Sequence, residues 1–130
     1  MDSKKAIALI IKLNRDTIEG KLTWQTSRVQ PSLGNGGIVI DNVYYTEVEK
    51  KILRLYKFSQ KYYYEEDSFE WTENLRLEFV DFYWKSEFEF PPISILSDLY
   101  ETVRYKTSGV ESFLDSYLGD EEPEEKDTDF

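Results

Sequence analysis

The chain has 130 residues, of which 40% are apolar and 32% are charged, a balance typical of one globular domain with its own core. It contains no histidine and no cysteine, so the usual ligands of structural zinc and the usual general base near neutral pH are absent from the sequence. The formal net charge of −10 disfavours direct contact with nucleic acid, which needs a concentrated basic surface. We expect a cytoplasmic protein without a membrane contact, because no apolar run approaches the roughly 20 residues that span a bilayer.

The negative charge is concentrated at the end of the chain. Residues 119–130 hold seven acids and one base, a net charge of −6, which leaves −4 for residues 1–118. Blocks of like charge are usually disordered. The sequence therefore predicts a single α+β domain over 1–118 and a disordered acidic tail over 119–130. An interaction tail for a basic partner is the alternative.

The first predicted element is an amphipathic helix over residues 4–19, capped by Ser3 and ended by Gly20. Four isoleucines are expected on the face that covers a sheet: Ile7, Ile10, Ile11, Ile18. A first strand over 21–28 follows, in which Leu22 and Trp24 alternate with polar residues.

The middle of the chain, from residue 43 to residue 90, predicts antiparallel strands. Leu75, Leu77 and Phe79 alternate with charged residues, and Phe88 and Phe90 alternate with acids, so each set is expected in the core. Hairpins are expected from strands over 43–48 and 52–58, and from a strand over 71–81 with one ending at residue 90. Pro91 and Pro92 end the sheet.

Two helices are expected after the prolines. The first starts at Ser94 or Ser97 and has an apolar face of Leu96, Leu99, Tyr100, Val103. The second restarts through a capping box of Ser108 and Glu111 and has the apolar face Val110, Phe113, Leu114, Tyr117, Leu118. The predicted fold class is α+β: an antiparallel sheet of about five strands, covered by an N-terminal helix and a C-terminal helix pair.

No group of residues predicts an active site. The Gly-rich segment 32–37 lacks the lysine of a phosphate-binding loop and leads into an apolar strand, so a loop is expected there. Glu87 and Glu89 are expected to face water, where carboxylates do no acid–base work. The acids at 65–67 match no calcium-loop spacing. We therefore expect no enzyme, no cofactor and no metal.

The excess of aromatic residues is more informative. Three clusters occur on strands or turns, and because consecutive strand residues point to opposite faces, each cluster must expose at least one ring. The candidate partner-binding residues are Tyr62, Tyr63, Tyr64, Phe82, Tyr83, Trp84, while Tyr44 and Tyr45 form the third cluster. Exposed tyrosine and tryptophan are typical anchors of protein interfaces. Packing of the same rings under helices, loops or a second subunit is the structural alternative.

The leading functional hypothesis is a non-enzymatic protein-interaction module. An alternative is a protein that binds or sequesters a nucleotide-like ligand through the cations Lys21, Arg28, Arg54, Arg76, Arg104, Lys106, if at least three of them converge. An acidic mimic of DNA is disfavoured because the charge lies mainly in the tail. The strand over 52–58 is apolar on both faces, which suggests a homodimer interface.

Three segments resemble a group of small, mostly uncharacterised prokaryotic and phage proteins with the pattern T-x-x-G-K-L-x-W, several strands, then L-Y-x-x-x-R. In this sequence they are residues 17–24, 75–79 and 99–105. The resemblance implies the order helix, sheet, helix and a prokaryotic or phage source, with a role as an accessory or inhibitor in a bacterial or phage conflict system. It implies no catalytic residue. The departure from the pattern is the hairpin tip, where Phe82, Tyr83 and Trp84 replace an expected Asp and Gly.

Overall fold

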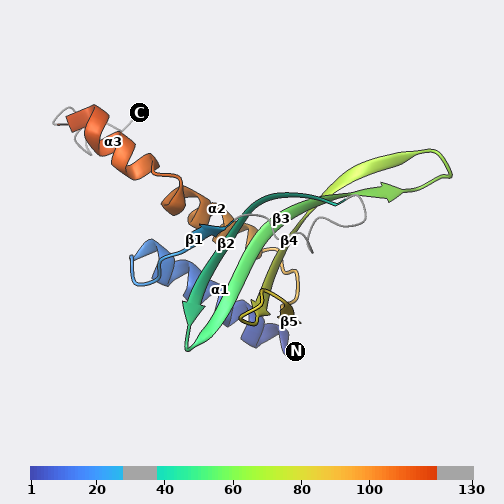
Figure 1. Ribbon diagram of the computed structural model, residues 1–130, viewed down its shortest axis with the longest axis horizontal. Coiled ribbons are helices and arrows are strands. Elements are labelled where there is room, and N and C mark those ends of the chain that lie inside the picture. Colours follow the sequence, from blue (N-terminus) through green and yellow to red (C-terminus); the bar gives the residue numbers. More distant parts are fainter. Residues whose placement is uncertain (28–37, 120–130) are drawn as a thin grey trace.

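A five-stranded antiparallel sheet forms the centre of the molecule, and its strands lie side by side in chain order (Figure 1). The structure is a computed structural model that describes residues 1–27 and 38–119. The described elements are α1 (Ser3–Ile18), β1 (Gln25–Ser27), β2 (Val39–Val48), β3 (Lys51–Tyr63), β4 (Phe69–Val80), β5 (Ser86–Glu89), α2 (Leu96–Thr107) and α3 (Val110–Leu118). They confirm the predicted α+β fold class. None of these helices is long and apolar enough to cross a membrane.

Two predicted segments fall outside the described residues. The Gly-rich segment 32–37 is one, and the acidic tail is the other, apart from Gly119. The predicted first strand is shorter than expected, because the described pairing of β1 with β2 covers Gln25–Ser27.

The connection from α1 to β1 is fixed by a buried pair of side chains. Thr17 Oγ1 donates a hydrogen bond to the carbonyl of Leu13 at 2.7 Å and accepts one from Trp24 Nε1 at 3.0 Å. Gly20 lies between them with a φ of 78°, a conformation that favours glycine. The segment that matches T-x-x-G-K-L-x-W therefore ends a helix and anchors the start of the sheet.

The N-terminal cap of α1 is Asp2 rather than the predicted Ser3. The Asp2 carboxylate accepts a hydrogen bond from the backbone N–H of Lys4 at 3.0 Å. An acid at this position also interacts favourably with the helix dipole. The helix therefore starts one residue earlier than expected.

The main core lies between one face of the sheet and the helices α1 and α2. Leu53, Leu55 and Leu77 project from the central strands β3 and β4 and are at most 2% exposed. The buried side chains around them come from both helices and from segments at the edges of the sheet: Ile10, Leu13, Trp24, Tyr44, Phe90, Leu96, Leu99, Tyr100, Val103. The alternation in the sequence predicts this face because residues two apart on a strand share a side.

The buried stripe of α1 is rotated from the predicted one. Its members are spaced by three or four residues: Ala6, Ile10, Leu13, Thr17. Ile7, Ile11 and Ile18 are exposed, so their predicted burial is wrong. The helix is apolar over more of its circumference than the sheet and α2 cover.

β3 is buried on its second face as well. Arg54, Tyr56 and Phe58 are at most 7% exposed, and Ile38 and Ile40 pack against the smaller cluster there. The prediction of a strand covered on both faces is confirmed. A second subunit is not needed to explain it, because the chain itself buries these side chains.

The β2–β3 hairpin closes on two residues with positive φ, neither of which is glycine. Glu49 has a φ of 52° and Lys50 a φ of 66°. Turns of this kind prefer Asn and Gly, since other residues pay a steric cost there. We expect Lys50→Gly to raise the free energy of unfolding by about 0.5–1 kcal/mol in urea denaturation.

The control for this prediction is Lys51→Gly, one residue further along at the first position of β3, where φ is not positive. Glycine there gives up more conformational freedom on folding and relieves no steric cost, so this variant should be less stable than the wild type by about 0.5–1 kcal/mol. Shifts of the same sign in both variants would contradict the turn geometry.

α3 extends away from the sheet instead of covering it (Figure 1). None of its residues is buried, and Phe113 and Tyr117 are largely exposed. The predicted capping box of Ser108 and Glu111 is wrong, because Gly109 is the N-cap residue and the Ser108 hydroxyl accepts from the N–H of Val110, at 3.3 Å, rather than from that of Glu111. In the described part of the chain, α3 therefore projects from the body with its apolar side uncovered.

Candidate functional site

β3 and β4 extend beyond the rest of the sheet as a two-stranded arm (Figure 1). Among the described residues, β2 pairs with β3 as far as Ser59, whereas the pairing of β3 with β4 continues to Tyr63 and Phe69. We call residues 60–72 the aromatic arm. A turn over 64–68 closes it.

The helices do not reach the aromatic arm because the strands are longer. The 13 residues of β3 span about 43 Å, while the 16 residues of α1 span about 24 Å. A two-stranded hairpin alone is only marginally stable in water. The continuous pairing of β3 and β4 through the body of the sheet therefore holds the arm in place.

Five aromatic side chains of the aromatic arm are exposed: Tyr62, Tyr63, Tyr64, Phe69, Trp71. Tyr63, Phe69 and Trp71 share one face, with ring centroids 5.5 Å apart for Tyr63 and Phe69 and 6.2 Å apart for Phe69 and Trp71. Tyr62 points to the other face, because adjacent strand residues alternate. The predicted exposure of at least one ring in the 62–64 cluster is confirmed.

Sequence reasoning missed Phe69 and Trp71 as site residues. Trp71 lies on the same face as Leu75 and Leu77, so alternation alone places it in the core. In the structure the helices that cover this face of the sheet end before β4 does, and Trp71 is 52% exposed. The signal in the sequence is the length of the strand-like run compared with the helices available to cover it.

The aromatic arm also carries charge. Lys61 Nζ lies 4.4 Å from the ring centroid of Phe69 and 5.7 Å from that of Trp71, at cation–π distance. Against this one base stand four acids: Glu65, Glu66, Asp67, Glu70. The resulting net charge of −3 opposes a phosphate backbone, although the rings themselves are able to stack on bases.

The β4–β5 loop, residues 81–85, exposes two of its three predicted contact rings. Phe82 and Tyr83 are each 90% exposed. Asp81 Oδ1 accepts hydrogen bonds from the backbone N–H groups of Tyr83 and Lys85, both at 2.9 Å. The carboxylate of Asp81 thus organises a turn that the sequence, lacking Gly or Asn at this tip, does not indicate.

Trp84 turns back onto the sheet and does not extend this exposed surface. Its ring meets Tyr45 edge to face with centroids 5.0 Å apart. Its φ of 64° is unusual for a bulky residue, and its carbonyl accepts a hydrogen bond from Arg54 Nη1 at 2.9 Å. Trp84 is therefore half-buried support for the loop rather than a free contact residue.

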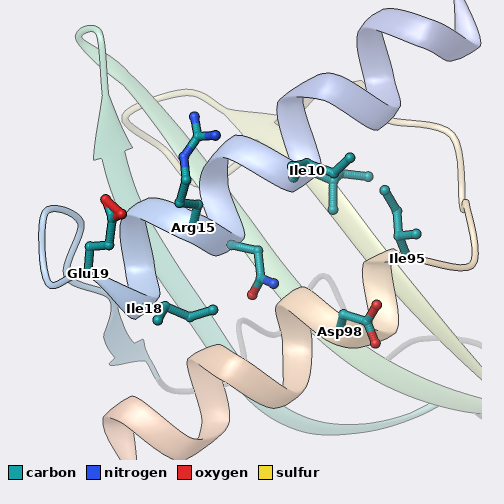
Figure 2. A pocket seen from close by; sticks show the side chains of 8 residues that line it. Ile10, Arg15, Ile18, Glu19, Ile95 and Asp98 are labelled. Atoms are coloured by element: carbon teal, nitrogen blue, oxygen red, sulfur yellow. The ribbon is translucent and has the colours of Figure 1, made fainter.

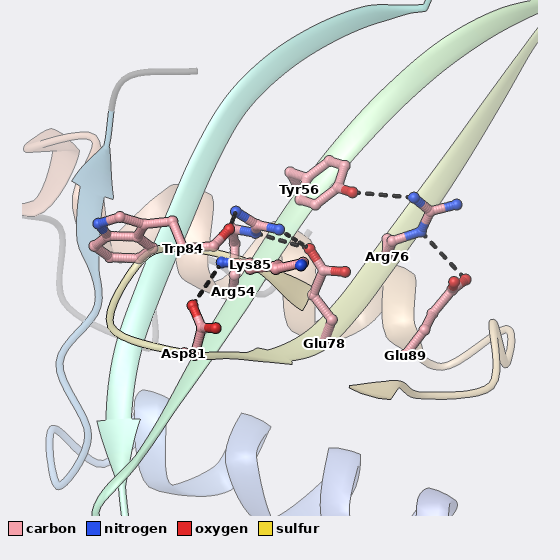
Figure 3. A network of polar contacts seen from close by, with 8 residues as sticks. All are labelled: Arg54, Tyr56, Arg76, Glu78, Asp81, Trp84, Lys85 and Glu89. Atoms are coloured by element: carbon pink, nitrogen blue, oxygen red, sulfur yellow. Dashed lines mark hydrogen bonds and ion pairs between the residues drawn. The ribbon is translucent and has the colours of Figure 1, made fainter. Parts of the chain in front are cut away.

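Arg54 and Glu78 form an ion pair on the second face of the sheet (Figure 3). Arg54 Nε donates to Glu78 Oε1 at 2.7 Å, and Nη2 donates to the same oxygen. Both side chains are at most 3% exposed. With its bond to the Trp84 carbonyl, Arg54 links β3, β4 and the 81–85 loop.

Tyr56 and Arg76 lie beside this pair (Figure 3). Arg76 Nη1 donates to the Tyr56 hydroxyl at 3.2 Å. Burial raises the pKa of Tyr56 above its ordinary value of 10.0, and the charge of Glu78 adds to the rise, while the cations Arg76 and Arg54 offset it only in part. Burial lowers the pKa of Arg76, but Tyr56 and the carboxylates of Glu89 and Glu78 outweigh it, so that pKa is raised.

The raised pKa of Tyr56 predicts a loss of stability in alkali. Folded Tyr56 holds its proton more tightly than the unfolded chain does, so its contribution is complete below pH 10.0 and is lost as the pH rises through the folded pKa. We expect the free energy of unfolding to fall more steeply above this pH in the wild type than in Tyr56→Phe, measured by urea denaturation. Tyr117→Phe, which removes an exposed hydroxyl, is the control; equal slopes for the wild type and Tyr56→Phe would refute the prediction.

The cations that would contact a nucleotide-like ligand do not converge in the part of the chain that the structure describes. Arg54 and Arg76 share a face, but each is paired with a glutamate, the latter with Glu89 at 3.2 Å. The other described cations lie on other elements and have acidic partners. Lys21, between α1 and β1, pairs with Glu19, and on α2 Arg104 pairs with Glu101 and Lys106 with Glu111. Arg28 is outside the described residues. This dispersion counts against the ligand-binding alternative.

The acids of β5 face water, as predicted, since Glu87 and Glu89 are exposed. Phe88 is 43% exposed, so its predicted place in the core is wrong, whereas Phe90 is buried. β5 is a four-residue strand at the edge of the sheet, where the helices give less cover. Within residues 1–27 and 38–119, no group of three or more acids is arranged to hold a metal ion.

Comparison of this chain with models of known protein families, with curated protein sequences and with solved structures finds no match.

Proposed function

We propose that this chain is a non-enzymatic protein-interaction module that binds a protein partner through the aromatic arm. The observation that carries the proposal is the ring cluster of Tyr63, Phe69 and Trp71, which is exposed on a projecting hairpin. Contiguous exposed apolar surface marks interaction sites, and aromatic anchors contribute most of the binding energy at protein interfaces.

The chemistry of the aromatic arm defines the partner it fits. The rings need an apolar groove, and the acids at 65–67 need cations near the end of that groove. A hairpin also enters a narrow cleft more easily than the flat face of a sheet. We therefore propose a partner with an apolar cleft and a basic rim.

The 81–85 loop is the second contact that we propose, through Phe82 and Tyr83. Trp84 supports this loop from beneath. The resemblance of the sequence motifs to prokaryotic and phage proteins supports an accessory or inhibitor role in a bacterial or phage conflict system.

Affinity capture from a lysate of the source organism tests the proposal with three forms of the full chain. These are the wild type, the arm variant Tyr63→Ser with Trp71→Ser, and the loop variant Phe82→Ser with Tyr83→Ser. All replaced residues are exposed, so each form should remain folded. We expect a stoichiometric protein that the wild type retains and the arm variant loses. Equal retention by the wild type and the arm variant would exclude the aromatic arm as the main contact.

A further inference from the structure

α1 presents to solvent an apolar stripe that is separate from the aromatic arm. Ile7, Ile11 and Ile18 follow one another along the helix outside its buried stripe, and they are between 37% and 54% exposed. We call these three residues the outer stripe. Over this distance α1 rises about 16 Å.

A groove between α1 and α2 runs beside the outer stripe (Figure 2). Ile10 and Ile18 of α1, Asp98 of α2 and Ile95, the N-cap residue of α2, line it, and its volume is ≈ 280 Å³. Asn14 also lines the groove, and its buried Oδ1 has no hydrogen-bond partner among the described residues. An incoming hydroxyl would satisfy that oxygen.

α3 is the complementary element in shape and composition. Phe113 and Tyr117 stack with ring centroids 5.8 Å apart on one exposed side, and Leu114 lies beside them. The nine residues of α3 span about 13.5 Å, close to the length of the outer stripe. The hydroxyl groups of Tyr117 and Ser116 can donate the hydrogen bond that Asn14 Oδ1 lacks.

The charges of the two helices are complementary too. α1 carries four bases and one acid, a net charge of +3 in a chain with a net charge of −10. Lys4, Lys5 and Arg15 make no ion pair among the described residues. α3 has a net charge of −2, from Glu111 and Asp115, and the sequence after it is strongly acidic. Opposite charge favours the encounter and the register of two such surfaces.

We propose that α3 of one copy of this chain docks on the outer stripe and groove of a second copy, and that the second copy does the same in return. Each contact would cover six exposed apolar side chains, which amounts to roughly 600 Å² of surface. The two equivalent contacts of a twofold dimer reach about 1,200 Å², the lower end of the range for specific interfaces.

The geometry of the α2–α3 junction favours a second copy over the chain's own α1. Lys106 Nζ pairs with Glu111 Oε1 at 3.1 Å across the junction, and Gly109 adopts a φ of 81°. This arrangement holds α3 away from the body, on the side opposite the aromatic arm (Figure 1). Docking onto the same chain would require the helix to reverse at Gly109 and break that ion pair.

Sedimentation equilibrium of the full chain at concentrations up to about 100 µM tests the proposal, since it detects dimers of micromolar affinity. We expect a dimer whose dissociation constant rises at least tenfold in Phe113→Glu with Tyr117→Glu. Phe82→Glu with Tyr83→Glu, equally exposed but outside the interface, is the control and should leave the dimer intact. A monomeric wild type, or a dimer that persists in the α3 variant, would overturn the proposal.

The absence of cysteine from the chain allows a second, geometric measurement. Ile11→Cys and Tyr117→Cys are made in separate copies, mixed and oxidised. We expect a disulfide between the two different variants, and none between Ile11→Cys and Tyr83→Cys. Equal yields from both mixtures would show that α3 does not dock on α1 of another copy. This readout stays valid if the glutamate substitutions unfold α3.

Discussion

Replacing Arg54 with methionine is expected to lower the free energy of unfolding by about 3–5 kcal/mol. The substitution leaves Glu78, which is 2% exposed, without its partner inside the sheet. It also removes the donor to the Trp84 carbonyl, so the 81–85 loop should loosen. Urea denaturation measures the first effect, and amide hydrogen exchange at residues 81–85 measures the second.

Two further variants show whether the loss comes from the unpaired charge. Arg54→Met with Glu78→Leu removes both charges, and we expect it to recover most of the lost stability, because replacing a whole buried pair is often neutral. Arg104→Met breaks the exposed pair with Glu101 and should cost less than about 1 kcal/mol. A double variant as unstable as Arg54→Met would point to packing rather than charge.

Shortening the aromatic arm is expected to abolish partner capture while the fold persists. Replacing residues 61–71 with Asn-Gly closes the hairpin at the Gln60–Thr72 pair and removes all five exposed rings of the arm. A two-stranded extension adds little to stability, so the free energy of unfolding should change by less than about 1 kcal/mol. Affinity should fall at least about a hundredfold, since several aromatic anchors are lost together.

Capture of the partner and urea denaturation, both on the shortened chain, check these two expectations. Tyr105→Ser is the control, because it removes an exposed ring on α2 that belongs to neither proposed partner contact. Retention of the partner by the shortened chain would mean that binding occurs elsewhere. Unfolding of the shortened chain would mean that the arm supports the core.

Much of the fold follows from the spacing of residues in the sequence. Leu53, Leu55 and Leu77 lie in the core because period-two alternation specifies one side of a strand. Leu99 and Val103 of α2 are buried as their helical spacing predicts. Short-range patterns define a buried face well where a neighbouring element covers it.

The same patterns do not indicate how much of a strand or helix face the neighbouring elements cover. Trp71 and Phe88 follow the alternation of buried residues, yet both are exposed because they lie beyond the helices or at the sheet edge. Ile11 fits an apolar helix stripe but is exposed, because the sheet and α2 cover only part of the circumference of α1. Such departures depend on the relative lengths and positions of elements, which are tertiary properties.

The buried ion pair was also beyond sequence reasoning. Arg54 and Glu78 are 24 positions apart, and they meet only because the register of β3 and β4 places them opposite one another. The positive φ of Trp84 is likewise fixed by its contacts with Tyr45 and Arg54. The exposure of at least one ring among Phe82, Tyr83 and Trp84 was predictable, since adjacent rings at a hairpin tip exceed what one face can bury.

Site-specific photo-crosslinking in cells of the source organism tests the central claim most directly. Benzoylphenylalanine replaces Trp71 on the aromatic arm, and in a separate form it replaces Tyr105 on α2, which is similarly exposed. The proposed function predicts one discrete protein adduct from position 71 that position 105 does not give. Absence of an adduct from 71, together with an adduct from another surface of a folded chain, would contradict binding through the aromatic arm.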